Sequence, residues 1–233
     1  MSRAVEWLRR VPGLLPLTRR LRAALGSGAA QPFAGSADYW RERYAKGGNS
    51  GPGSYGKFAE FKARVLNAWF REAGLSSAIE FGCGDGNQLR LLEVDDYLGV
   101  DVSAQAVARC RAAFAGLPGR RFMLADDYAG ERAECALSLD VIYHLVEDEA
   151  FDRYMRRLFA AATRCVVIYS SNQIGNATND GAHVRHRRFT DWVAQHQPGW
   201  RLERHVPNEY PYRDDWRTGS FADFYIYLSA AAT

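Results

Sequence analysis

Three glycines at alternating positions constrain the fold of this chain more than any other feature. A short run at residues 78–81 includes Glu80, and Gly82, Gly84 and Gly86 follow it directly. Glycine has no Cβ atom and readily adopts positive φ, so such a turn lets a flat or anionic ligand approach the backbone. The pattern therefore predicts a strand that ends in a ligand-binding turn, with a leucine-rich helix after it.

The spacing of these glycines separates two classes of cofactor. A dinucleotide fingerprint, G-x-G-x-x-G, would need its third glycine at the position of Asn87, but it comes one residue earlier, at Gly86. This argues against NAD and FAD. The spacing E-x-G-x-G-x-G resembles the first motif of class I S-adenosylmethionine-dependent methyltransferases. The resemblance implies S-adenosylmethionine as cofactor, S-adenosylhomocysteine as product, and Glu80 and the three glycines in the cofactor site.

A second strand is predicted at residues 97–102, with Ser103 as the N-cap of a helix at 104–114. Asp101 lies 21 residues after Glu80, which is the separation that a βαβ unit imposes. Its carboxylate can accept both O–H groups of a ribose diol. The alternative, that Asp101 merely caps the next helix, stays open. Val102 is expected beside it in the cofactor site.

Two further strands supply the remaining cofactor candidates. The strand at 121–125 ends in Asp126 and Asp127, and the resemblance implies that either one contacts the adenine amino group. The strand at 135–140 contains Leu139. It leads into residues that resemble the family segment flanking the methyl donor, with His144 as a packed histidine or a direct participant.

The rest of the pattern completes a seven-stranded sheet. A helix is predicted at 147–162, a fifth strand at 164–170 and two last strands at 200–206 and 221–229. We expect the last two to form an antiparallel hairpin. The fold predicted is thus α/β, a Rossmann-like class I methyltransferase sheet with helices on both faces and an antiparallel C-terminal strand. A chain of 233 residues with 47% hydrophobic content suffices for one such domain.

The first 35 residues are predicted to be separate from this domain, which would occupy 36–233. Residues 1–25 hold six arginines and one glutamate among leucines, and a glycine-rich linker follows. This basic amphipathic segment suits the surface of an anionic membrane, or packing on the protein or a partner subunit. It is too interrupted for a secretory signal or a membrane span.

A glycine-dense segment before the first strand is predicted to act as a lid over the donor, at residues 36–57. Within it, Tyr55 or Lys57 is expected to reach the methionine end of the cofactor. The helix at 58–73 that follows carries its large apolar residues at helical spacing, which indicates core packing.

The loop after the fifth strand is the candidate for acceptor recognition. It brings Asn172, His183, Arg185 and His186 to the carboxyl edge of the sheet, where ligands bind in open α/β folds. Amides and guanidiniums suit a polyhydroxylated or anionic acceptor. The alternative is a solvated basic turn. A metal is not expected, because His183 and His186 lack cysteine partners.

These observations predict methyl transfer to a small polar acceptor, most simply a saccharide hydroxyl, with His144, His183 or His186 as the base. The stretches at 53–56, 183–187 and 223–227 also resemble methyltransferases associated with bacterial glycan assembly. A nucleic-acid acceptor is disfavoured, because the Asn/Asp-Pro-Pro-aromatic and Pro-Cys motifs are missing. A lipid or quinone methyltransferase at the membrane, and a donor-binding partner without catalysis, remain alternatives.

The cysteines indicate the compartment. Cys83, Cys110, Cys135 and Cys165 lie far apart in the sequence and in no metal-ligand spacing. We expect reduced thiols in a cytoplasmic protein, with peripheral contact at the inner face of the membrane as the further hypothesis. The oligomeric state is not predicted.

Overall fold

The computed structural model describes residues 33–177 and 180–232. The chain divides into two units, Met1–Ala34 and Gly35–Thr233, and every element below belongs to the second. The predicted amphipathic segment at 1–25 lies outside the described residues. Within those residues, no helix has both the length and the apolar content needed to cross a membrane.

A seven-stranded sheet forms the centre of the second unit, in the order β3-β2-β1-β4-β5-β7-β6. The first five strands are parallel, and β7 runs antiparallel to both of its neighbours, β5 and β6. The predicted α/β fold with an antiparallel C-terminal strand is confirmed. The strands are β1 Ser77–Phe81, β2 Asp96–Asp101, β3 Arg120–Leu124, β4 Ala133–Leu139, β5 Ala162–Ser170, β6 Trp200–Val206 and β7 Asp223–Ser229.

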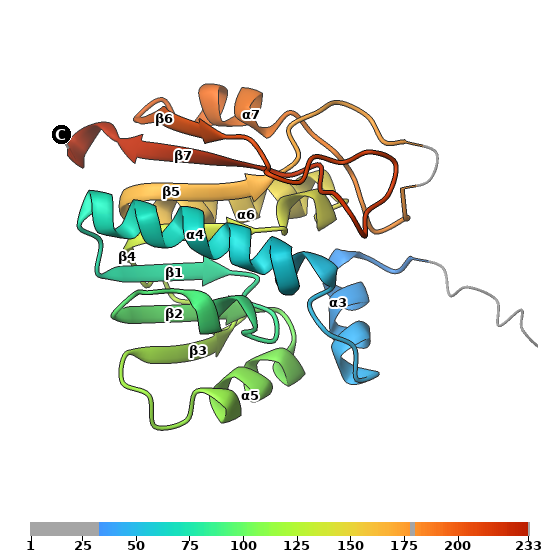
Figure 1. Cartoon of the computed structure of the whole chain (residues 1–233), viewed down its shortest axis with the longest axis horizontal. Helices are drawn as coiled ribbons and strands as arrows, with labels where there is room; N and C mark the ends of the chain where they lie inside the picture. Colours follow the sequence, from blue (N-terminus) through green and yellow to red (C-terminus); the bar gives the residue numbers. More distant parts are fainter. Residues whose placement is uncertain (1–32, 178–179, 233) are drawn as a thin grey trace, which may run out of the picture. The chain divides into compact units, whose positions relative to one another are not determined.

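Helices cover both faces of the sheet, as predicted (Figure 1). Successive residues of β4 show why: Cys135 and Leu137 pack into one apolar cluster with α4 and α5, while Ala136 packs into the other with α6 and α7. Both faces of the central strands are therefore buried. The helices are α3 Ser36–Ala45, α4 Gly56–Ala73, α5 Ala104–Ala113, α6 Asp148–Ala161 and α7 Phe189–His196, with short 3₁₀ turns η2 Pro52–Ser54, η3 Gln88–Leu91, η4 Ile142–His144 and η5 Ala230–Ala232.

One predicted helix is replaced by a single turn. After the glycines, the chain makes only η3 before β2 begins at Asp96, so the expectation of a full helix there was wrong. The strand β1 is five residues long, or about 17 Å, and a helix spanning that length would need about eleven residues. The segment between Gly86 and Asp96 is too short for such a helix and for the turns at its two ends. The chain therefore returns to β2 through the 3₁₀ turn η3 and a few residues without regular structure.

The connection between the last two strands also differs from a tight hairpin. Residues 207–222 separate β6 from β7 and carry a bridge between Pro211 and Ser220. The strands still pair antiparallel, because this loop folds back on itself.

Helix α3 lies beyond the carboxyl ends of the parallel strands (Figure 1). Its first residue, Ser36, donates through both N and Oγ to the Glu147 carboxylate just before α6, at 2.9 and 2.6 Å. At its other end, the Arg109 guanidinium of α5 donates to the carbonyls of Tyr44 and Gly48, at 3.1 and 2.6 Å. The helix is thus fastened on both sides of the sheet edge and covers what lies between.

Candidate active site

A cavity of about 590 Å³ lies at the carboxyl edge of the sheet, beneath α3. Four neighbouring parallel strands, β3, β2, β1 and β4, contribute to its lining where they end, and α3 closes it with Trp40, Arg41 and Tyr44. In the order of the sheet, the lining includes Asp126 after β3, Asp101 and Val102 at β2, Gly82 and Gly84 after β1, and Leu139, Asp140, Val141 and His144 at β4.

The glycine turn has the conformation that its sequence predicts. Gly82, Gly84 and Gly86 have φ of 86°, 58° and 75°, in the region that disfavours other residues. A Cβ atom on Gly82 would lie 2.5 Å from Val141, and one on Gly84 would lie 2.3 Å from the Ser50 hydroxyl. The missing Cβ atoms therefore let Val141, after β4, and Ser50, in the lid segment, pack directly against the backbone of the turn. Gly86 does not line it.

Asp101 is joined to this turn by a backbone hydrogen bond. Its Oδ2 accepts from the N–H of Gly84 at 2.9 Å, and its Oδ1 accepts from the N–H of Ser103 at 2.9 Å. Burial raises the pKa of the Asp101 carboxyl, and these backbone bonds oppose the rise. Each oxygen keeps a lone pair, so the carboxylate can still accept the two O–H groups of a diol. The N-cap of α5 is Ser103, whose Oγ accepts from Ala106 N at 3.3 Å.

Glu80 lies behind the turn rather than in the cavity. Its side chain is buried and accepts a hydrogen bond from the Tyr97 hydroxyl at 2.5 Å. Burial raises the pKa of the Glu80 carboxyl to about 7. The Glu80 side chain therefore joins β1 to β2 behind the cavity.

Asp126 and Asp127, the two adenine candidates, are both exposed. Asp126 belongs to the cavity lining and Asp127 does not. The Asp126 carboxylate is 3.8 Å from the Arg41 guanidinium of α3. Arg41 also donates from Nε to the Val102 carbonyl at 3.3 Å. The lid helix is thus tied to the β2 and β3 end of the cavity.

The lid segment is fastened to the glycine turn by Asp85. The Asp85 carboxylate accepts from Ser50 N at 2.9 Å and from the Tyr55 hydroxyl at 2.7 Å. Burial acts to raise the pKa of Asp85, but these bonds hold it below its usual value. Tyr55 points to Asp85 and is not part of the cavity lining, and Lys57 donates to the Thr218 carbonyl at 2.8 Å.

At the β4 end of the cavity, Asp140 has a left-handed backbone with φ of 60°. Its Oδ2 accepts from Lys62 Nζ at 2.7 Å, and its Oδ1 accepts from the Tyr143 hydroxyl at 2.9 Å. The sequence patterns above did not predict this cluster. A signal was present: Phe58, Lys62 and Leu66 lie four residues apart, so a lysine stands in the apolar stripe of α4.

His144 lines the cavity with its tautomer set by a hydrogen bond. Its Nδ1 lies 3.0 Å from the His183 carbonyl, which can only accept, so Nδ1 carries the hydrogen and Nε2 keeps a lone pair. The edge of Trp40 packs against the ring at 5.0 Å between centroids. Burial lowers the pKa of His144 to about 4, so the imidazole is neutral near pH 7.

The other predicted acceptor residues lie in the loop at 171–188, outside the cavity lining. His183 stacks between His144 and Tyr39, and its pKa is lowered by burial. His186 is buried, with Nδ1 2.6 Å from Ser171 Oγ and Nε2 3.3 Å from Asp180, and burial likewise lowers its pKa.

Asn172 and Arg185 hold the same loop in place. Asn172 Oδ1 accepts from Thr190 N at 3.3 Å in the first turn of α7. Arg185 donates to the Val146 carbonyl at 2.8 Å, and its backbone N–H donates to the Tyr143 carbonyl at 2.7 Å. The loop is therefore built against the β4 end of the cavity.

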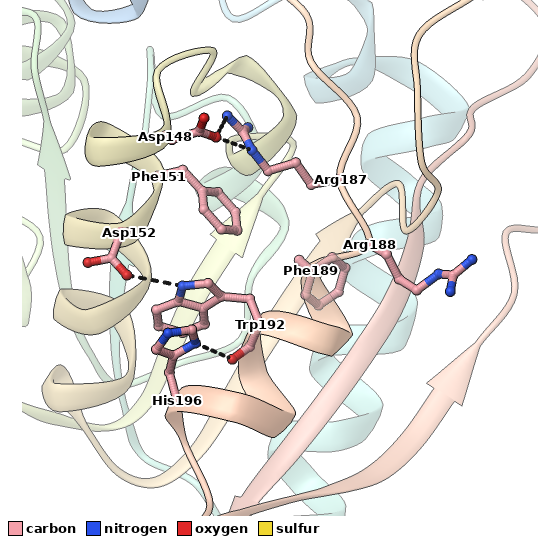
Figure 2. Close-up of a pocket in the computed structure, with 8 residues that line it drawn as sticks. All are labelled: Asp148, Phe151, Asp152, Arg187, Arg188, Phe189, Trp192 and His196. Carbon is pink, nitrogen blue, oxygen red and sulfur yellow. Dashed lines mark hydrogen bonds and ion pairs between the residues drawn. The ribbon is translucent and has the colours of Figure 1, made fainter.

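A second, shallower pocket of about 350 Å³ lies between α6 and α7, away from the strand ends. Figure 2 shows Arg187 paired with Asp148, at 2.9 Å, and Trp192 Nε1 donating to Asp152, at 3.1 Å. These bonds join α6 to α7 and to the residue pair just before it. Within the described ranges, no three His, Cys, Asp or Glu side chains are grouped as a metal site.

Comparison with known proteins agrees with this arrangement. Residues 79–167, from β1 into β5, match a family model described as a methyltransferase domain. No curated protein sequence matches the chain significantly.

Several solved structures share the fold. Magnesium protoporphyrin IX methyltransferase from Synechocystis PCC 6803, crystallised with S-adenosylhomocysteine, has a TM-score of 0.60 at 16% identity, covering 83% of this chain and 97% of that one. An amino pentose methyltransferase of calicheamicin biosynthesis from Micromonospora echinaspora has a TM-score of 0.55 at 14% identity, and the match covers 76% of this chain and 93% of that one. The bacterial methyltransferase domain CtHen1-C has a TM-score of 0.57 at 20% identity, and the match covers 73% of this chain and 97% of that one. Residues 79–167 thus match a methyltransferase domain, and the described part of the second unit has the same fold as these solved methyltransferases.

Proposed function

We propose that this protein transfers a methyl group from S-adenosylmethionine to a hydroxyl of a small polar acceptor, of the saccharide or glycan class. The observation that carries the proposal is Asp101, a buried carboxylate bonded to the glycine turn and facing a cavity at the strand ends. A diol-binding acid joined to a glycine turn is what an adenosine ribose requires.

The residues present fit this cofactor. The cavity, about 590 Å³, has the size of a small-molecule site, with a few polar groups among apolar ones. Asp101 would hold the ribose and Asp126 the adenine amino group, while Val102 and Leu139 supply apolar walls. When bound, S-adenosylmethionine supplies an electrophilic methyl group for an in-line displacement.

His144 is the residue we assign as base. Its ring is fixed by the bond to the His183 carbonyl, and its Nε2 takes the proton of the acceptor hydroxyl. Trp40 and Tyr44 of α3 cover the cavity and exclude water from the nucleophile. His183 and His186 are the next candidates, and they would act after a movement of their loop.

The acceptor class is supported by the loop at 171–188, which adjoins His144 and presents amides and guanidiniums. Asn172 and Arg185 are the acceptor-binding candidates of this loop, although both make structural bonds in this state. One solved structure with the same fold is an amino pentose methyltransferase, which shows that the fold accommodates a sugar acceptor. The O-linked product and the glycan class are parts of the proposal.

Residues 1–25 favour a location at the membrane. Their charge of +5 and their alternating leucines suit a peripheral contact with anionic lipid at the cytoplasmic face. The same feature supports the second candidate function, a methyltransferase that acts on a lipid or quinone.

The test uses the full chain. Calorimetric titration should show binding of S-adenosylmethionine and S-adenosylhomocysteine in preference to NAD. Labelled donor should then be supplied with sugars, glycolipids and quinones in parallel. Transfer to sugars supports the proposal. Transfer only to lipids or quinones supports the second candidate. Donor binding without any turnover would indicate that the protein binds the donor but is not an enzyme.

A further inference from the structure

The ion pair between Lys62 and Asp140 has no part in the mechanism above. We propose that this pair sets the relative affinity of the site for the positively charged donor and its neutral product. The inference rests on the proposed function, because it concerns the same cavity.

Asp140 is held rigidly at the end of β4. Lys62 and Tyr143 each donate to one of its oxygens, and its own N–H donates to the Tyr169 carbonyl at 3.0 Å. The side chain of Asp140 remains 15% exposed and lines the cavity, whereas that of Lys62 is 1% exposed. The pair therefore presents its carboxylate to the ligand and hides its ammonium.

The position along the sheet edge places Asp140 at the sulfonium end. Asp126 and Asp101 lie at β3 and β2, on the side assigned to adenine and ribose. The glycine turn follows at β1, and Asp140 and His144 lie at β4. A ligand with its ribose on Asp101 extends the rest of its length toward β4, where the charged sulfur of the donor differs from the neutral sulfur of the product.

The positive charge of Lys62 limits how much more tightly the site binds the charged donor than the neutral product. A lone carboxylate in a cavity of low dielectric would stabilise the sulfonium strongly. That gain would be lost as methyl transfer removes the charge, so it would stabilise the bound donor more than the transition state. Lys62 Nζ lies 2.7 Å from this carboxylate, so its positive charge opposes the field of Asp140 at the ligand.

The proposal makes opposite predictions for the two partners. Lys62→Met leaves the carboxylate alone, so the affinity for the donor relative to the product should rise by about tenfold or more. Asp140→Asn leaves the ammonium alone, so the same ratio should fall by about tenfold or more. The double variant, Lys62→Met with Asp140→Asn, removes both charges and should return the ratio to within about threefold of the wild type.

Tyr143→Phe is the matched control. It removes one hydrogen bond to the same carboxylate without changing any charge, so the ratio should stay within about threefold of the wild type. Both dissociation constants are measured by calorimetry, and thermal unfolding without ligand reports the stability of each variant. A general loss of packing would weaken donor and product alike and leave their ratio unchanged.

The outcomes separate the two proposals. If the wild type binds neither ligand, the proposed function fails. If the wild type binds both, and the ratio is unchanged or moves in the same direction in the two single variants, the inference about Lys62 and Asp140 is overturned. If one single variant does not fold, the other and the double variant still decide the sign.

Discussion

The backbone N–H of Gly84 donates to the Asp101 carboxylate at 2.9 Å, which joins the turn after β1 to the end of β2. The two features lie 17 residues apart in the chain and form one binding unit at the sheet edge. Together with the bond from Ser103 N to the other oxygen, it fixes the position of the Asp101 carboxylate in the cavity wall.

Replacing this acid should weaken cofactor binding. Asp101→Ala removes a charge-assisted acceptor, so we expect the affinity for S-adenosylmethionine and S-adenosylhomocysteine to fall by about 1.5 to 3 kcal/mol. Calorimetry measures both. Asp96→Ala, at the other end of the same strand, is the control and should leave both affinities unchanged. Equal binding by wild type and Asp101→Ala would remove the ribose assignment.

His144→Ala should lower kcat by about 10² to 10⁴ while leaving donor affinity intact. Because burial lowers the pKa of His144 to about 4, its neutral form persists down to that pH. The rate should therefore stay flat from about pH 8 to 6 and show no step near the ordinary histidine value of about 6.5. His196→Ala, on α7, serves as control, and activity should survive a chelator. Near-normal turnover without His144 would direct attention to His183 and His186.

Glu80 should make stability depend on pH. Its folded-state pKa of about 7 exceeds the unfolded value of about 4.5, so the folded state keeps a proton that the unfolded chain loses between these values. The free energy of unfolding should thus fall as pH rises through this window. Glu80→Gln cannot titrate, so its free energy of unfolding should not show this fall. Relative to wild type, the variant should become more stable by about 3 kcal/mol between the low-pH and the high-pH end of the window.

Urea unfolding near pH 4.5 and near pH 8 measures the effect. The control is Glu60→Gln on the exposed face of α4, for which no such difference is expected. A parallel response of Glu80→Gln and wild type across this range would show that the Glu80 carboxyl titrates normally.

Asp85→Ala should loosen the lid. The substitution removes the acceptor for Ser50 N and the Tyr55 hydroxyl, each worth about 0.5 to 1.5 kcal/mol. We expect faster proteolysis within residues 46–55 and faster donor dissociation, because α3 then closes the cavity less often. The exposed Asp95, replaced in the same way, is the comparison. Unchanged cleavage and unchanged dissociation would mean that the lid is held without Asp85.

Deleting residues 1–25 tests the membrane hypothesis. The segment carries a charge of +5, so its loss should abolish salt-sensitive binding to anionic vesicles. Turnover of a soluble acceptor should be nearly unchanged. A truncated protein that unfolds or changes its oligomeric state would indicate that the segment packs on the protein instead.

The fold was predictable because its signals are local. Apolar runs ending in acids, such as the one before Asp101, mark parallel strands, and alternating glycines mark the turn after β1. Each signal lies within a few residues, where backbone preference and burial act together. The predicted helix after the glycines failed for a reason of length, since too few residues separate Gly86 from β2.

Short-range patterns were enough to predict the seven strands, their order along the chain and the position of Asp101 at the end of β2. Which distant side chains meet depends instead on how the elements pack. Lys62 and Asp140 are 78 residues apart and become partners because α4 packs across the end of β4. His144 acquires its tautomer only because the loop carrying His183 folds against it. Such contacts depend on how packed layers bring separate segments together, and no local pattern encodes that.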